Sequence, residues 1–489
     1  MEFETVIGLE VHVELSTKSK IYCTCSTEFG AEENTHICPV CTAFPGTLPA
    51  LNKQVVEYCI KAGLALDCKI NRYSRQDRKH YFYPDLPKAF QTSQFDLPLC
   101  YDGFVDLRVP EGDPLDGKAN KPSYTKRVGI TRIHIEEDAG KLIHEAGVTR
   151  LDCNRCGIPL IEIVTEPDFR TAGEVYAFLN HLRAVLIYSD VSNCRMEEGS
   201  MRCDVNLSLR PSADAPFGTR TETKNIASLS ATVRAIEYER NRQRKVLQKG
   251  GTITQNTLRW DDERGENYAM RSKEDAQDYF YFPEPDIMPI VVDDEWLNSI
   301  RASLPELPHV RRNRYVGELG LPEYDADFLV GDKVISDLFD ECVTLGSAPK
   351  SISNWLMSDV ARLCNDTGTG FDQLRFGAKG LTDLISLVEG GTISRSAGSK
   401  VLESMFTPDE RRSPEELVKA LGLAQVSDES TILEMCKTAI ASNEKAVADY
   451  RGGKEKALTS LVGQVMKASR GKANPAVVNK LMKELLAEQ

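Results

Sequence analysis

The sequence predicts an α+β fold in three parts: a large domain that mixes strands and helices (1–295), an all-α domain (296–411) and a small all-α domain (412–489). In the first part, strand-like stretches and helices mix without a regular βαβ period, which favours α+β over a doubly wound sheet. After residue 296 the strand signals fade, and apolar residues recur at helical spacing.

The composition is that of a globular protein and excludes several classes. Of 489 residues, 41% are apolar and 27% charged, and no apolar run is long enough to span a membrane. The formal net charge of -13 argues against a protein that coats nucleic acid, although one basic domain remains compatible with it. The N-terminus begins directly on a strand pattern without a signal or transit peptide, so we expect a cytoplasmic protein.

The first predicted strand, "VIGLEVHVEL" at residues 6–15, has two chemically different faces. Successive side chains on a strand point to opposite faces, so the aliphatic residues line one side. Glu10, His12 and Glu14 line the other. One face can join a core, while the other carries two carboxylates around an imidazole.

Two short cysteine pairs follow this strand. "YCTC" carries Cys23 and Cys25, and "ICPVC" carries Cys38 and Cys41. Four thiolates on turns can complete the tetrahedron of a structural zinc ion, and such a closed site would hold a loop rather than catalyse. Buried or redox-active thiols are the alternative. In a chain without a secretion signal, thiols and metal ligands are expected more than disulfides.

A third pair, Cys153 and Cys156 in "CNRCG", has no obvious partner pair. A single CxxC motif is weak evidence for function. The sequence favours incidental thiols and leaves metal or redox chemistry open.

Acidic residues recur on later strand-like stretches that are otherwise apolar. Burying carboxylates there is costly unless they are paired or bound to metal. These stretches supply Glu136, Glu137, Asp138, Glu162, Glu197, Glu198, Arg202, Asp204, Lys224 and Asn225. A magnesium ion would be held by such oxygen ligands and would bridge the phosphates of a nucleotide, with Arg202 or Lys224 neutralising further charge.

Two points about these acids stay open from the residues alone. Each could lie on the solvated outer face of a strand. Glu137 lies on the same face of the predicted strand as Ile133 and Ile135, whereas Glu136 lies on the face of His134. Only one of the two glutamates therefore faces the site, unless a bulge turns them. There is no Walker-type loop and no GxGxxG motif opening a helix, so a bound ATP would rely on metal and on strand residues.

The last helices are basic in an otherwise acidic chain. Residues 448–489 hold eight Lys or Arg against four Asp or Glu. Lys467, Arg470 and Lys472 in "VMKASRGKANP" could contact a phosphate backbone with little base readout, and a solvated helix face is the alternative.

Several motifs, in order along nearly the whole chain, resemble one family: the B subunit of the tRNA-dependent amidotransferase that acts on Asp-tRNA(Asn) and Glu-tRNA(Gln). These are "ETVIGLEVHVEL", "DRKHYFYPDLPKAFQTSQFDLPL", "GITRIHIEEDAGK", "PLIEIVTEPDFR", "MEEGSMRCDVNLSLRP", "DYFYFPEPDIMP", "SNWLM" and "LVGQVMKASRGKANP". The two zinc-type cysteine pairs also match many members, whereas Cys153 and Cys156 stand where the family usually has other residues.

The resemblance implies a catalytic cradle domain, which is an α+β unit around an antiparallel sheet with a zinc-binding insertion. It also implies a helical domain and a tRNA-binding tail. It implies that ATP phosphorylates the side-chain carboxylate of the misacylated amino acid, and that ammonia then forms the amide. Ammonia would come from a glutaminase A subunit, with a small C subunit completing a heterotrimer. This chain has no Ser-Ser-Lys amidase arrangement, so glutamine hydrolysis belongs to another chain.

The resemblance also implies roles for residues of this chain. Glu10, His12 and Glu137 would bind magnesium, and Glu162, Glu198 and Asp204 would complete the acidic catalytic pocket. Arg202, Lys224 and Asn225 would bind substrate, Cys23, Cys25, Cys38 and Cys41 structural zinc, and Lys467, Arg470 and Lys472 tRNA. A non-catalytic tRNA-binding or assembly paralogue and an unrelated metal-dependent hydrolase are the alternatives. The sequence does not choose between the two misacylated tRNAs.

Overall fold

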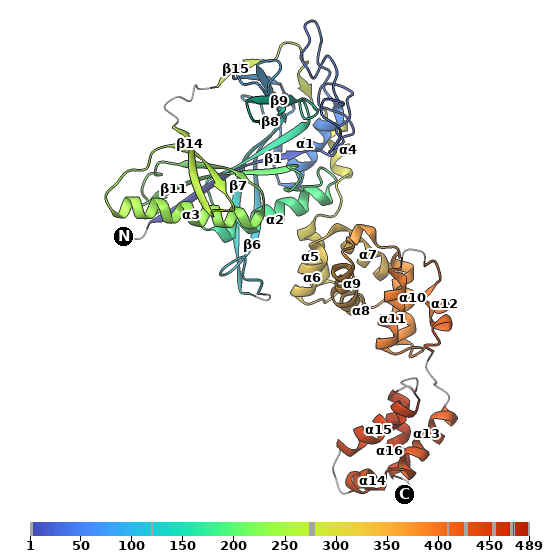
Figure 1. The fold of residues 1–489 in the computed structure, drawn as a ribbon. Helices are drawn as coiled ribbons and strands as arrows, with labels where there is room; N and C mark the ends of the chain where they lie inside the picture. Colours follow the sequence, from blue (N-terminus) through green and yellow to red (C-terminus); the bar gives the residue numbers. More distant parts are fainter. Residues whose placement is uncertain are drawn as a thin grey trace. The chain divides into compact units, whose positions relative to one another are not determined.

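A computed structural model describes residues 3–118, 121–272, 279–407, 410–424, 429–451, 456–469, 473 and 475–487. The chain divides into two compact units, Met1–Val310 and Arg311–Gln489. The first holds the strands, and the described residues of the second are helices and their connections (Figure 1). The predicted α+β fold with a helical C-terminal region is confirmed. None of the described helices is long and apolar enough to cross a membrane.

A nine-stranded sheet, ordered β14-β13-β12-β11-β1-β10-β7-β6-β2, forms the centre of the first unit. Neighbouring strands pair antiparallel except β12 and β13, which are parallel. In chain order the strands are β1 (Glu4–Glu14), β2 (Lys69–Ile70), β6 (Cys100–Pro110), β7 (Ser123–Glu137), β10 (Pro159–Thr165), β11 (Met201–Arg210), β12 (Thr221–Ile226), β13 (Asn256–Asp261) and β14 (Glu266–Ser272). β1 therefore lies in the middle of the sheet.

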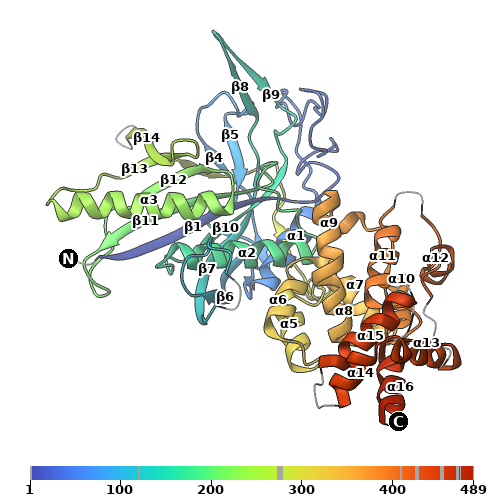
Figure 2. The same cartoon turned by 60° about the horizontal axis from the view of Figure 1, so that its bottom comes forward.

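Three helices pack against the apolar side of this sheet: α1 (Lys53–Ala65), α2 (Ala172–Tyr188) and α3 (Leu229–Gln248). Figures 1 and 2 show α2 and α3 lying along the sheet. Each of the three begins at an Asn, Thr or Ser whose side chain accepts a hydrogen bond from an amide of the first turn, as expected of N-caps. The aliphatic residues of β1 are buried in the core shared with these helices, so its polar residues occupy the opposite face.

Smaller sheets surround the large one. The three-stranded sheet β15-β4-β5 consists of β4 (Asp77–His80), β5 (Phe90–Ser93) and β15 (Phe280–Pro283). β8 (Lys141–Glu145) and β9 (Val148–Asp152) form a hairpin, and β3 (Tyr73–Ser74) pairs with β16 (Ile290–Val291). β5 contacts the end of β7, which brings polar side chains of the small sheet to the acids of the large one.

The remaining helices belong to three separate cores. α4 (Asp294–Ala302) packs into the core of the large sheet. The second core takes α5 (Pro308–Gly317), α6 (Glu323–Val330), α7 (Lys333–Thr344), α8 (Pro349–Asn354), a π-helical segment (Trp355–Val360), α9 (Ala361–Thr367), a 3-10 turn (Phe371–Gln373), α10 (Ala378–Glu389), α11 (Arg395–Met405) and α12 (Pro414–Ala420). The third takes α13 (Glu429–Ala441), α14 (Glu444–Arg451), α15 (Lys456–Ala468) and α16 (Pro475–Ala487).

These cores differ from the boundaries drawn on the sequence at two helices. Leu297 and Ile300 of α4 are buried in the sheet core, although residues from 296 on were assigned to the helical domain. Leu417 and Val418 of α12 are buried in the second core, although residues from 412 on were assigned to the tail. Helical periodicity shows where helices begin, but it does not show which core receives their apolar faces.

Candidate active site

Strand pairing places polar residues of four strands in one row across the large sheet. His12 on β1 pairs with Glu162 on β10 and with Arg202 on β11, and Glu162 pairs with His134 on β7. Directly paired side chains of antiparallel strands lie on the same face, about 5 Å apart at Cβ. The acid-and-imidazole face predicted for the first strand therefore continues onto its neighbours.

One group with metal-ligand spacing contains His12, Glu136 and Glu162, whose ligand atoms lie within 4.8 Å of one another. His12 Nε2 lies 3.5 Å from Glu162 Oε2, and His134 Nε2 lies 3.3 Å from the same oxygen. Glu136 accepts hydrogen bonds from Gln91 (2.5 Å) and Ser93 (2.8 Å) of β5. An imidazole with two carboxylates is a donor set that fits a hard divalent cation.

A second group contains Glu10, Asp204 and Glu222, again with ligand atoms within 4.8 Å of one another. Asn206 donates to Glu10 Oε1 at 3.0 Å. Lys224 Nζ lies 2.5 Å from Asp204 and 3.0 Å from Glu222, so its ammonium partly balances these two carboxylates. Glu10 and His12, one from each group, are alternate residues of β1, roughly 7 Å apart along the strand.

The charges of the first group stabilise one another. Burial favours neutral His12, but the hydrogen bond and charge of Glu162 outweigh burial and raise the pKa of His12. Burial would also raise the pKa of Glu162, yet His134 and His12 hold the pKa of that carboxyl well below its ordinary range. For Glu136, the charge of Lys79 and the hydrogen bond from His134 overcome burial and lower the pKa to about 2.

The second group is less well compensated. Burial raises the pKa of Glu10, and the nearby carboxylates of Glu162 and Glu222 raise it further, against the opposing charge of Lys224. Burial disfavours the charged form of Lys224, but Asp204 and Glu222 outweigh it and raise the pKa of Lys224. A cation at this group would relieve repulsion among its carboxylates.

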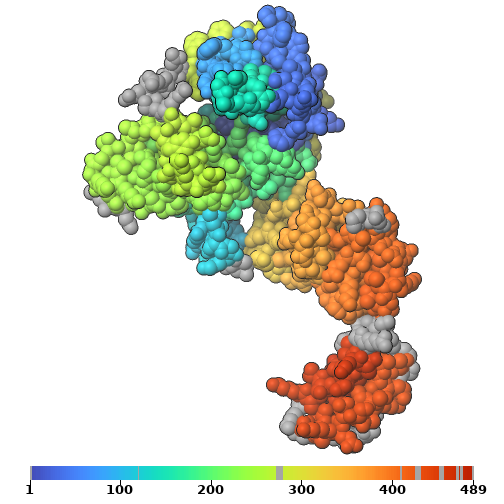
Figure 3. Space-filling view, in the orientation of Figure 1, coloured from blue at the N-terminus to red at the C-terminus, as the bar shows by residue number. Residues whose placement is uncertain are grey.

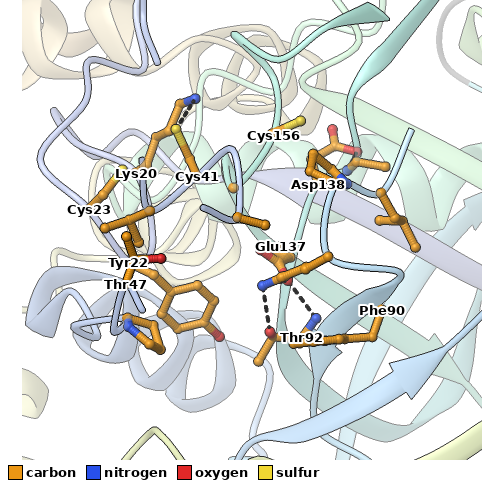
Figure 4. A pocket seen from close by; sticks show the side chains of 18 of the residues that line it. Lys20, Tyr22, Cys23, Cys41, Thr47, Phe90, Thr92, Glu137, Asp138 and Cys156 are labelled. Atoms are coloured by element: carbon orange, nitrogen blue, oxygen red, sulfur yellow. Dashed lines mark hydrogen bonds and ion pairs between the residues drawn. The ribbon is translucent and has the colours of Figure 1, made fainter. Parts of the chain in front are cut away.

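The structure does not bring Glu137 to either group. Glu137 Oε1 accepts from the Thr92 amide at 2.6 Å and lies 2.5 Å from Lys88 Nζ. Figure 4 shows Glu137 beside Thr92 in a cavity of about 170 Å³ that Cys41 and Cys156 also line. Glu136 takes the place beside His12 that the sequence-based ligand set gave to Glu137. The side chains of β7 alternate between the two sheet faces up to the end of the strand, so no bulge turns Glu137 toward His12.

The other proposed site residues divide between this face and its edges. Asp204 lies in the second group with Lys224 beside it, and Arg202 donates to Asp138 at 2.8 Å. Glu198 pairs with Arg195 at 2.8 Å and lines a separate cavity with Glu14 and Arg202. Asn225 is exposed with φ 65 at a register shift between β11 and β12, a bulge that leaves it outside both groups.

The four cysteines predicted to bind zinc meet at one point. Their sulfur atoms lie within 4.8 Å of one another, which fits a tetrahedral thiolate site. Residues 15–52, all of them described, form no helix or strand and only one isolated bridge, between Ser19 and Ser26. A hydrogen bond with Cys23 lowers the pKa of Cys41 to about 4, and the ammonium of Lys20 also favours this thiolate.

Of the three residues proposed to contact tRNA, only Lys467 can be located. It is exposed in the last turn of α15. Arg470 and Lys472 lie outside the described residues.

Glu222, His134 and Lys79 join the site without having been singled out from the sequence. Glu222 lies on the same strand face as Lys224 in "TETKNI", and His134 lies on the same face as Glu136. The alternation of strand residues could therefore have identified both Glu222 and His134. No local pattern marks Lys79. It lies 3.7 Å from Glu136 because β4 and β5 pack over the end of β7.

Comparison with known proteins identifies the family of this chain. The model of the GatB/GatE catalytic domain family matches residues 5–298, and that of the GatB domain matches residues 337–486. The first match contains both groups and the cysteine loop. The chain belongs to the family of amidotransferase B subunits, so the resemblance recognised in the sequence is confirmed.

Curated relatives of this family match over nearly their whole length. The chain is 54% identical to the B subunit of the aspartyl/glutamyl-tRNA(Asn/Gln) amidotransferase of Caldicellulosiruptor bescii, with 99% of each chain covered. It is 52% identical to the same subunit from Thermoanaerobacter pseudethanolicus, with 100% of each covered, and 49% identical to that from Clostridium tetani, with 99% of each covered.

Proposed function

We propose that this chain is the ATP-using subunit of a tRNA-dependent amidotransferase. It would phosphorylate the side-chain carboxylate of Glu-tRNA(Gln), Asp-tRNA(Asn) or both, and convert it to the amide. The observation that carries the proposal is the pair of three-residue groups on one sheet face, joined through Glu10 and His12 of β1. Family membership supports the substrate class.

The two groups fit divalent cations by their donor chemistry. His12, Glu136 and Glu162 would hold one, and Glu10, Asp204 and Glu222 the other. When bound, such cations would neutralise and orient the phosphates of ATP during phosphoryl transfer. Two sites are proposed because the ligand atoms fall into two separate sets of three.

A cavity of about 260 Å³ beside Glu10 offers a place for the nucleoside of ATP. It is lined by Gly8 and Glu10 of β1, Asn206 and Ser208 of β11, and the connection that carries Phe217 and Arg220. Phe217 is exposed and could stack on a base, and Arg220 could neutralise a phosphate. This end of the face would bind ATP, and the acceptor carboxylate would approach past His12.

In the first step, an oxygen of the aminoacyl carboxylate attacks the terminal phosphorus of ATP, and ADP leaves. In the second, ammonia attacks the carbonyl carbon of the acyl phosphate, inorganic phosphate leaves, and the amide forms. Lys224, which balances two carboxylates on this face, would stabilise the negative charge of the phosphates. Ammonia would come from glutamine hydrolysed by an A subunit, with a C subunit completing the complex.

The decisive test uses the chain reconstituted with its A and C partners. We expect ATP consumption only when misacylated tRNA is present, and amide formation on one or both tRNAs. Glu10→Gln and His12→Ala should each lower amidation by at least about 1,000-fold, about 4 kcal/mol of lost transition-state stabilisation, while glutamine hydrolysis persists. Full amidation by either variant, or tRNA binding without any ATP use by the native chain, would contradict the proposal.

The cysteine cluster and the last core would have supporting roles. We propose that the cysteines bind a structural zinc ion and that the unit of α13 to α16 contacts the tRNA backbone. Lys467→Ala should weaken tRNA binding a few-fold and flatten its salt dependence, because one phosphate contact is lost. Lys437→Ala, which removes another exposed lysine, on α13, is the control. Equal effects of the two variants would argue against a specific contact.

A truncation gives a larger effect. Ending the chain at residue 424 removes the last core but keeps Leu417 and Val418 in the core they complete. The shortened chain should lose most of its tRNA affinity and keep ATP binding. Unchanged tRNA affinity would place the contact elsewhere.

A further inference from the structure

The third cysteine pair has no role in the proposed reaction, and its surroundings are specific. Cys153 and Cys156 follow β9, in the turn that leads into β10, and both are buried. The Cys156 amide donates to the Cys153 carbonyl at 3.1 Å, which closes a β-turn. β-Turns hold their end Cα atoms within about 7 Å, and disulfides need about 4.4–6.8 Å, so the backbone is already near disulfide geometry.

This turn is fixed against the cysteine loop. Cys153 N donates to Asn34 Oδ1 at 2.7 Å, and His36 N donates to Asn154 Oδ1 at 2.8 Å. Lys20, whose side chain is fully buried, donates to the Cys153 carbonyl at 3.0 Å and lies 3.6 Å from Cys41 Sγ. In Figure 3 the β8–β9 hairpin (teal) lies against this loop (blue). These contacts fix the turn, so the Cα atoms of Cys153 and Cys156 stay within the span of a β-turn.

The pair lacks what a metal site needs but has access for a small reagent. Among the described residues, the groups of three or more metal-ligand side chains include neither Cys153 nor Cys156. Cys156 lines the cavity of about 170 Å³ that Cys23 and Cys41 also line (Figure 4). This space accommodates a molecule the size of hydrogen peroxide. If zinc holds the other four thiolates, these two are the uncoordinated thiols nearest the cavity.

We propose that Cys153 and Cys156 form a reversible oxidation site, which closes to an intramolecular disulfide under peroxide while the four zinc-type cysteines remain reduced. One thiol attacks the peroxide O–O bond, becomes a sulfenic acid and releases water. The second thiol attacks that sulfur, forms the S–S bond and releases a second water. Sulfur is oxidised, peroxide oxygen is reduced, and a dithiol reductant restores both thiols by exchange.

The chain contains a matched internal control. The sulfur atoms of Cys59 and Cys100 lie 4.0 Å apart, in contact with each other, and both residues are fully buried. Neither lines the cavity of Cys156. If closeness alone decided oxidation, both pairs would react. If access through the cavity decides it, only Cys153 and Cys156 will.

The experiment treats the zinc-loaded full-length chain with graded hydrogen peroxide, then alkylates, digests and identifies peptides by mass spectrometry, with zinc measured in parallel. We expect a Cys153–Cys156 disulfide at the lowest effective dose, zinc retained, Cys59 and Cys100 still alkylated, and reversal by dithiothreitol. Cys153→Ser should leave a sulfenic acid that dimedone traps on Cys156, the thiol that lines the cavity. Cys156→Ser should leave Cys153 unoxidised at the same dose, because Cys153 does not line it. Zinc release or Cys59–Cys100 oxidation before the disulfide forms, or Cys153 and Cys156 staying alkylatable throughout, would overturn the proposal.

Discussion

The polar face of the large sheet and the cysteine loop both gather metal-ligand side chains, but they hold them differently. On the sheet, strand register places His12 beside Glu162 and Glu10 beside Asp204, and imidazole or ammonium groups balance the carboxylates. In the loop, four cysteines converge from a segment without helix or strand. The sheet site is therefore organised by strand pairing, whereas the loop is held by turns, by hydrogen bonds to the turn after β9 and by whatever its four cysteines bind.

This difference matches the two kinds of chemistry proposed for these regions. A site that performs phosphoryl transfer must bind and release a nucleotide with its cations, so its ligands need to stay in place without them. A structural site has no such cycle, and its metal can supply folding free energy directly. The following predictions test whether the sheet is preorganised and the loop is not.

Metal removal should separate the two regions most clearly. After chelation, amide exchange in residues 17–50 should accelerate by about 1,000-fold, because the loop loses the folding free energy of its zinc. Amides of β1 and β10 should keep their protection. Hydrogen exchange with mass spectrometry measures both in one sample. An unchanged exchange rate in the loop, or an equal loss of amide protection in the sheet, would contradict the proposed difference between the two regions.

Acid titration of the metal-free protein tests whether the sheet charges stabilise the fold. The pKa of Glu136 is lowered to about 2 from an ordinary 4.5. A depressed carboxyl pKa gives stability that is fully present above pH 4.5 and lost as the pH falls toward 2, at most about 3 kcal/mol. Glu136→Gln should remove this contribution.

The difference in local unfolding free energy between native chain and Glu136→Gln should shrink as the pH falls from 7 to 3. Denaturant-dependent exchange of β7 amides measures it. A difference that does not change with pH would mean that packing rather than charge is responsible.

Cation binding tests which of two adjacent glutamates faces the site. Glu136→Gln should weaken Mn²⁺ binding at least about 10-fold, because a ligand of the His12 group becomes neutral. Glu137→Gln should leave Mn²⁺ affinity nearly unchanged, because Glu137 contacts Thr92 and Lys88 instead. Electron paramagnetic resonance gives both affinities. The reverse order would restore Glu137 as the ligand.

Much of the site could be predicted from the first strand and from the later strand-like stretches that also carry acidic residues. Alternation placed Glu10 and His12 on one face, and the cysteine spacing gave the four ligands that the structure brings together. Strand alternation allows only one of Glu136 and Glu137 to face the site, and the structure places Glu136 there instead of the expected ligand Glu137. Glu198 lines a cavity with Glu14 and Arg202 outside the two groups, so its catalytic role stays a prediction.

The sequence by itself determined the α+β class, the helical C-terminal region and the residue types available for metal and phosphate chemistry, because local periodicity and spacing encode these directly. Tertiary structure alone decided that the ligands form two sets rather than one, that Lys79 reaches Glu136, and that α4 and α12 join the cores preceding them. Those outcomes depend on strand order, register and packing between segments far apart in the chain, and no local pattern specifies them.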